Sequence, residues 1–228
     1  MIQQSLFGAL IEAETPAPSE HPGGSARDVA AALDTTTFTV IDVETTGLNP
    51  AKNALLEVTA IQYRQGQDLA VYSSLVQPNV AIPEEVEELT GINQAMVTGA
   101  PPLITVLTEL CKFVGPAPFI VGHNVGFDIR FVNQKLESTG LHSMTSRFDM
   151  ATALCTKTLA QRALPGLPSY QGIVVATQCG VRNDNPHRAE ADVRMSAGIL
   201  FALIDKLRTD GKSLHSVADL LTLQGPIS

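Results

Sequence analysis

The sequence predicts an α/β protein whose sheet mixes parallel and antiparallel strands. Three strand-like segments come first, and later strand-like segments alternate with helical ones. Of the 228 residues, 44% are hydrophobic and 17% are charged, which allows a substantial core and argues against disorder of the bulk. No apolar run approaches the roughly 20 residues that span a bilayer. We therefore expect no membrane segment. The three cysteines form no C-x-x-C pair, so we also expect no disulfide scaffold and a cytoplasmic protein.

Each predicted element has a local reason. Alternating β-branched residues predict strands, and a proline before an apolar period of three to four predicts the start of a helix. The strands are predicted over 37–44, 56–63, 70–76, 119–121 and 147–149. The helices are predicted from Pro83 (EEVEEL) and over 102–113, 124–136, 150–159, 189–203 and 214–221.

The chain divides into three parts by composition. Residues 1–11 hold a short apolar patch, and residues 12–35 are predicted to be a flexible linker, because they are rich in Pro, Gly, Ser and charge. The folded domain is predicted over 36–223. The net charge of −8 argues against a broad nucleic-acid surface, but residues 1–35, with five acids and one base, carry half of that excess.

Two acids stand in the first predicted strand among apolar residues. Side chains alternate along a strand, so Asp42 and Glu44 share a face with Phe38 and Val40. A two-residue step sets their Cα atoms about 6 to 7 Å apart, within reach of one divalent cation. The alternative is a strand end that emerges into water.

Two further acids occupy apolar faces of predicted helices. Asp128 falls within the apolar arc of helix 124–136, too deep for an N-cap, a role that Asn124 would fill better. Asp192 heads the row that continues through Met195 and Ile199, although Arg188 four residues earlier offers a simple ion pair instead. Buried acids need a partner, and four of them favour one shared cation site.

Oxygen ligands suit Mg²⁺ or Mn²⁺, and four carboxylates can hold two ions. Such a pair stabilises the attacking and leaving oxygens of a phosphoryl displacement. The water then needs a base. His187 is the candidate, in the loop or first turn before the helix that carries Asp192, and histidine changes its charge near neutral pH. An exposed loop histidine without a role is the alternative.

Three motifs now stand in order: IDVETTGL, GHNVGFD and HRAEAD. Together they resemble the exonuclease motifs of the DEDD superfamily of 3'-5' exonucleases, in its histidine (DEDDh, DnaQ-like) branch, over about residues 37–204. The tyrosine branch would carry Tyr at 188, where this chain has Arg. LTGI, followed by Met96 and Ala100-Pro101, resembles a segment common in DnaQ-like proofreading enzymes.

The resemblance implies a ribonuclease H-like fold with a mixed five-stranded sheet, and it implies roles for residues. Asp42 would bridge two metals, Glu44 and Asp192 would bind the tighter ion, Asp128 would serve the second, and His187 would deprotonate water. The implied nucleic-acid contacts are Thr45, Thr46, Leu48, Glu85, Thr90 and Asn124. For His123 a core role is at least as consistent as DNA contact, and for Phe127 and Phe131 we favour core packing over base stacking.

The expected reaction is removal of nucleoside 5'-monophosphates from the 3' end of single-stranded or frayed DNA, in repair or proofreading. The short segment after the domain is more like the exodeoxyribonuclease X type than a replicative epsilon-like subunit. RNA 3'-end trimming, as in ribonuclease T, is the enzymatic alternative. A non-catalytic clamp or polymerase accessory module is the other, and the presence of all five site residues argues against it.

The N-terminus offers a partner hypothesis. Gln3, Ser5, Leu6 and Phe7 in QQSLF resemble the bacterial sliding-clamp-binding pentapeptide, ahead of the predicted linker. A tethered peptide would raise the local concentration of nuclease near primer ends. The alternative is an amphipathic helix whose apolar face docks on the body.

Overall fold

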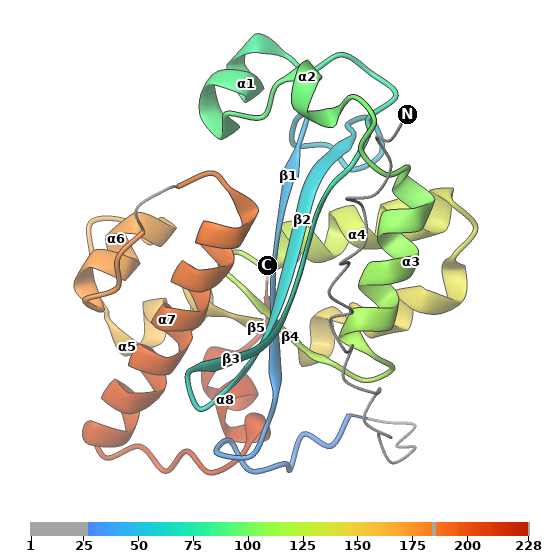
Figure 1. The fold of residues 1–228 in the computed structure, drawn as a ribbon. Coiled ribbons are helices and arrows are strands. Elements are labelled where there is room, and N and C mark those ends of the chain that lie inside the picture. Colours follow the sequence, from blue (N-terminus) through green and yellow to red (C-terminus); the bar gives the residue numbers. More distant parts are fainter. Residues whose placement is uncertain (1–26, 184–185, 228) are drawn as a thin grey trace, which may run out of the picture.

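The structure is a computed structural model, and it describes residues 27–183 and 186–227. A five-stranded sheet in the order β3-β2-β1-β4-β5 forms its centre (Figure 1). The strands are β1 (Phe38–Thr45), β2 (Leu55–Arg64), β3 (Gln67–Leu75), β4 (Phe119–Gly122) and β5 (Leu154–Cys155). The first three pair antiparallel, and β1–β4 and β4–β5 pair parallel, so the predicted mixed sheet is confirmed.

Strand β1 is longer than its parallel neighbour. It pairs with β2 along its whole length, but with β4 only from Phe38 to Val40. Residues 41–45 therefore continue past the end of β4, and their backbone groups on that side are available to other elements. This open stretch of β1 is where two of the predicted site acids lie.

Helices cover both faces of the sheet (Figure 1). On one face, β1 contributes Phe38 and Val40 to a core with α5, α6, α7 and α8. On the other, it contributes Ile41 and Val43 to a core with α3 and α4. The helices are α1 (Glu84–Thr90), α2 (Gln94–Val97), α3 (Leu103–Val114), α4 (Gly126–Ser138), α5 (Thr156–Ala163), α6 (Gly172–Gln178), α7 (Ala189–Thr209) and α8 (Val217–Gln224), with 3₁₀ turns η1 (His142–Arg147) and η2 (Met150–Thr152).

The region around the fifth strand differs from the prediction. The strand predicted over 147–149 is wrong, because the edge strand is Leu154–Cys155. The helix predicted over 150–159 is wrong in its first half, where η2 and β5 precede α5. Helix α6 was not anticipated. A strand of two residues is too short to show a period of two, so an apolar run there resembles part of a helix.

A side chain completes the edge of the sheet at β5. Gln224, at the end of α8, accepts a hydrogen bond from the Cys155 N–H (2.6 Å) and donates one to the Ala153 carbonyl (3.2 Å). Its amide thus occupies the place that a further strand would take. The C-terminal helix is thereby fastened to the strand next to β4.

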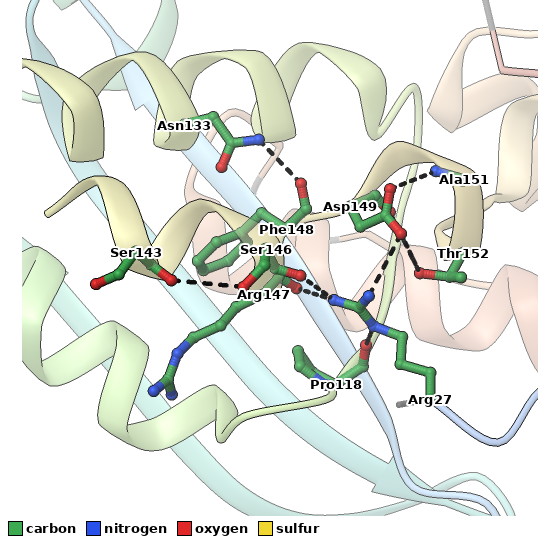
Figure 2. Close-up of polar contacts among 10 residues, drawn as sticks. All are labelled: Arg27, Pro118, Asn133, Ser143, Ser146, Arg147, Phe148, Asp149, Ala151 and Thr152. Atoms are coloured by element: carbon green, nitrogen blue, oxygen red, sulfur yellow. Dashed lines mark hydrogen bonds and ion pairs between the residues drawn. The ribbon is translucent and has the colours of Figure 1, made fainter. Parts of the chain in front are cut away.

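The N-terminal part of the described chain is fixed by Arg27 (Figure 2). Its guanidinium donates to the carbonyls of Pro118 (2.7 Å), Ser146 (2.6 Å) and Arg147 (2.8 Å), and it pairs with Asp149 at 3.4 Å. Leu33 is buried in the core beside α7. The predicted linker over 12–35 is therefore folded against the body from residue 27 onward, whereas residues 1–26, with the predicted clamp peptide, lie outside the described residues.

Within those described residues, none of the helices is long and apolar enough to span a membrane.

Candidate active site

Three carboxylates meet beside the open end of β1. Asp42 and Glu44 project from β1 toward α7, and Asp192 projects back from the first turn of α7. Oxygen atoms of the three lie within 4.8 Å of one another. The alternation of the strand and the apolar row of the helix thus bring these acids together, since Met195 and Ile199 of that row are buried.

The fourth predicted ligand, Asp128, lies on α4, at the edge of β1 that extends past β4. It is 3% exposed in the first turn of α4, and its Oδ1 accepts a hydrogen bond from the Val43 N–H at 3.1 Å, beyond the end of β4. It is near enough for its charge to raise the pKa of Asp42, but it is not one of the three mutually close carboxylates. Because α4 begins at Gly126, Asp128 is closer to the helix start than predicted.

The protonation of these acids reflects burial and mutual repulsion. Burial, and then the charge of Asp192, raises the pKa of Glu44 to about 8, and burial raises that of Asp128 to about 8. Burial followed by the charge of Asp128 raises the pKa of Asp42 well above its usual value, and burial also raises that of Asp192. A cluster of converging carboxylates with unfavourable negative charge fits a hard divalent cation.

His187 lies two residues before the start of α7, in the loop predicted for it from the sequence. Its backbone adopts a left-handed conformation (φ 62°), and its N–H donates to Asp192 Oδ2 at 3.0 Å. The other oxygen of Asp192 accepts from the Asn183 side-chain amide at 2.7 Å. The predicted alternative, a pair between Arg188 and Asp192, is not what the structure shows: the guanidinium binds Glu57 of β2.

A cleft of about 620 Å³ opens beside these acids, and both Asp42 and His187 line it. Its wall also includes residues that sequence reasoning did not single out, because they belong to α5, to α6, or to the segments before and after α6. They are Lys157, Ser169, Tyr170, Gln171, Ile173 and Asn183. Only the polar run before α6 gave any signal of their position.

The residues predicted to hold the terminal nucleotide have different surroundings. Leu48 is 85% exposed in the turn after β1. The Thr45 hydroxyl donates to the Gly47 carbonyl at 2.7 Å. Thr46 is buried, and its hydroxyl accepts from the Ala54 N–H at 2.8 Å, so it stabilises the turn. Leu48 is thus the most accessible of the three.

The more loosely matched contacts are also separated by the structure. Glu85 is exposed on α1, whereas Thr90 is buried. The Thr90 hydroxyl donates to the Val86 carbonyl and accepts from the Ile92 N–H, so it stabilises the end of that helix. Asn124 lines the cleft with a left-handed backbone, and its side chain accepts from Lys157 at 3.5 Å. It does not cap α4 with its side chain.

The three residues with two interpretations favour the structural one. Both ring nitrogens of His123 have protein partners, Thr156 Oγ1 and the Tyr170 carbonyl, each at 2.9 Å. Phe131 is fully buried, and the Phe127 ring lies 4.9 Å from it, centroid to centroid, against the same core.

Comparison with known proteins places this geometry in context. A family model described as Exonuclease matches residues 39–200. DNA polymerase III subunit epsilon of Aquifex aeolicus is 34% identical over 171 residues, which cover 75% of this chain and 82% of that protein. The 3'-5' exonuclease DinG of Bacillus subtilis is 33% identical over 172 residues, 75% of this chain but 18% of that protein.

Solved structures share the fold. Exonuclease X in complex with 5' overhanging duplex DNA matches with a TM-score of 0.61 at 24% identity, covering 82% of this chain and 99% of that one. E. coli Exonuclease I in complex with a dT13 oligonucleotide matches with a TM-score of 0.66 at 16% identity, covering 77% and 42%.

Proposed function

Because this chain belongs to the exonuclease family, that of the DEDD-type 3'-5' exonucleases, we propose that it hydrolyses the terminal phosphodiester of single-stranded or frayed DNA from the 3' end. The products would be nucleoside 5'-monophosphates. The observation that carries the proposal is the convergence of Asp42, Glu44 and Asp192 within 4.8 Å beside a cleft that His187 also lines.

The acids fit two Mg²⁺ or Mn²⁺ ions: Asp42, Glu44 and Asp192 would hold one ion, and Asp42 and Asp128 would serve the other. Bound divalent ions would neutralise charge on the attacking and leaving oxygens. His187 would accept the proton of the attacking water, since its exposed position at the cleft lets the imidazole reach substrate and solvent. Asn183 and the His187 N–H orient the Asp192 carboxylate.

The names of related proteins favour DNA as the substrate. The Aquifex relative is named as a DNA polymerase subunit, and two fold neighbours were solved with DNA. The cleft volume of about 620 Å³ accommodates a nucleotide. We propose a role in DNA repair or proofreading on the same grounds.

The test uses 3'-labelled and 5'-labelled single-stranded DNA, frayed duplex and RNA, each with Mg²⁺, Mn²⁺ or EDTA. We expect mononucleotide release from DNA with a divalent ion, and loss of activity in EDTA and in Asp42→Asn. Asp210→Asn, which removes an exposed acid just after α7, is the matched control and should retain activity. Activity in EDTA would overturn the two-ion mechanism, and a preference for RNA would overturn the substrate assignment.

We also propose that Gln3, Ser5, Leu6 and Phe7 bind a bacterial sliding clamp and thereby hold the nuclease near primer ends. Leu6→Ala with Phe7→Ala should abolish a complex with a purified clamp, whereas Leu10→Ala with Ile11→Ala should leave it intact. An unchanged complex in Leu6→Ala with Phe7→Ala would overturn the proposal and leave the alternative, an amphipathic helix docked on the body.

A further inference from the structure

Strand β2 contains a buried acid that is outside the proposed ligand set. Glu57 is 5% exposed and lies directly opposite Glu44 in the β1–β2 register. Its oxygens accept hydrogen bonds from Arg188 Nε (3.2 Å), Arg188 Nη2 (2.8 Å) and the Ala189 N–H (3.1 Å). One carboxylate therefore holds both prongs of a guanidinium and the first backbone N–H of α7.

The segment held by Glu57 is the one that carries the proposed base and a proposed ligand. His187 precedes Arg188 directly, and its N–H binds the Asp192 carboxylate. The Asp192 N–H in turn donates to the Arg188 carbonyl at 3.0 Å. Arg188 and Ala189 are thus the points at which the His187–Asp192 turn is attached to the sheet, next to Glu44 on β1.

We propose that Glu57 and Arg188 are a positioning pair, which fastens the start of α7 to β2 and so sets His187 and Asp192 opposite Asp42 and Glu44. This inference rests on the proposed function of the site. The pair does not touch the reacting atoms. It places one ligand, Asp192, and the base, His187. In other metal sites, residues that contact the ligands orient them in the same way.

The fork geometry explains why an arginine serves here. A guanidinium binds a carboxylate through two parallel N–H groups and is fixed in direction, whereas an ammonium is a point charge. Arg194, two turns further along α7, provides the contrast. It pairs with Asp68 and Glu190, but all three side chains are about half exposed, so its pairs lie in water.

The experiment measures turnover and the half-saturating Mn²⁺ concentration for Glu57→Gln, Arg188→Met and Arg188→Lys. Substitution of a residue that orients a metal ligand lowers metal affinity or activity by about 10- to 100-fold. We expect a loss of that size in Glu57→Gln and Arg188→Met. Arg188→Lys keeps the positive charge without the two parallel N–H groups, so its turnover and Mn²⁺ dependence should lie between those of Arg188→Met and the wild type. The double variant Glu57→Gln/Arg188→Met buries no unpaired charge, so it keeps the test valid if Arg188→Met fails to fold.

Arg194→Met is the matched control and should keep wild-type turnover and Mn²⁺ dependence. Unchanged turnover and Mn²⁺ dependence in the folded double variant, alongside an inactive Asp42→Asn, would overturn the positioning pair alone. An active Asp42→Asn would instead overturn the proposed function. A lower melting temperature with unchanged Mn²⁺ dependence would likewise reject the inference, because it marks a purely structural pair.

Discussion

Asp42 is surrounded by negative charge from several elements, and this repulsion decides what the metal-free site can do. Four other acids raise its pKa together with burial, namely Asp128, Glu44, Asp192 and Glu57. Among the described residues, Arg188 is the cation whose charge lowers the pKa of the neighbouring Glu44 and so opposes this repulsion. A site of this kind is strained without a counter-charge, so its stability should depend on pH and on metal.

The metal-free protein should therefore lose stability as pH rises. A carboxyl whose pKa is about 8 when folded and near 4.5 when unfolded binds more protons in the folded state between these values, so the free energy of unfolding falls with pH across that window. Glu44 and Asp128 both act in this direction. In urea unfolding with EDTA, the free energy of unfolding should decrease by at least about 1 kcal/mol between pH 5 and pH 8. A free energy of unfolding that stays constant over this range would contradict the prediction.

Mn²⁺ binding should release protons at neutral pH, because the ligands must be deprotonated. Titration calorimetry in buffers of different ionisation enthalpy reads the number released. The number should decrease above pH 8, where the carboxyl groups of Glu44 and Asp128 are already ionised. A pH-independent value near zero would show that these acids are ionised throughout.

His187→Ala should lower turnover by about 100-fold or more and leave Mn²⁺ binding largely intact, since general bases contribute on that scale and the backbone N–H to Asp192 remains. His142→Ala, an exposed histidine on η1, is the matched control. Equal loss of Mn²⁺ affinity in His187→Ala would make the imidazole a ligand.

Most of the acidic cluster follows from simple periodicity, and its omissions have physical causes. Asp42 and Asp128 were predicted to face inward because their neighbours at the strand and helix periods are apolar. Glu57 gives the same signal, because Leu55 and Ile61 stand at the strand period on either side of it, and only its partner Arg188 could not be read from the sequence. The pairing of residues 131 positions apart depends on the β1–β2 register and on where α7 begins against β2.

At the scale of elements, the reach of β1 beyond β4 creates the site. Long periodic elements such as α7 and β2 are predictable because many residues repeat the same signal. The two residues of β5 and the short α6 are not, since tertiary contacts rather than local pattern define them. The part of the cleft wall built from α6 was missed for that reason.

The fastening of β5 by Gln224 gives a prediction at this scale. Gln224→Leu removes both hydrogen bonds and leaves the Cys155 N–H and the Ala153 carbonyl buried, which should cost about 1 to 3 kcal/mol of stability. Gln178→Leu, at the exposed end of α6, serves as the control. Urea denaturation of both variants measures the difference, and equal stability would show that water replaces the lost partners.

For the molecule as a whole, charge limits how tightly nucleic acid is held. Lys157 is the only Lys or Arg among the described residues that line the cleft. Binding of single-stranded DNA to Asp42→Asn should therefore depend weakly on salt, with a slope of about −0.7 to −1.4 in log affinity against log salt, as for one or two phosphates. Lys157→Met should reduce the slope by about 0.7. A steep slope would reveal a basic path elsewhere.

The end of the described chain returns to α4. A Cβ atom added at Gly126, the first residue of that helix, would lie 3.3 Å from Ile227 Cγ2, so the last described residues lie beside the turn that carries Asp128. A bulkier or charged side chain at Ile227 would therefore disturb the helix start that carries a proposed ligand, although the two positions are about a hundred residues apart in the sequence.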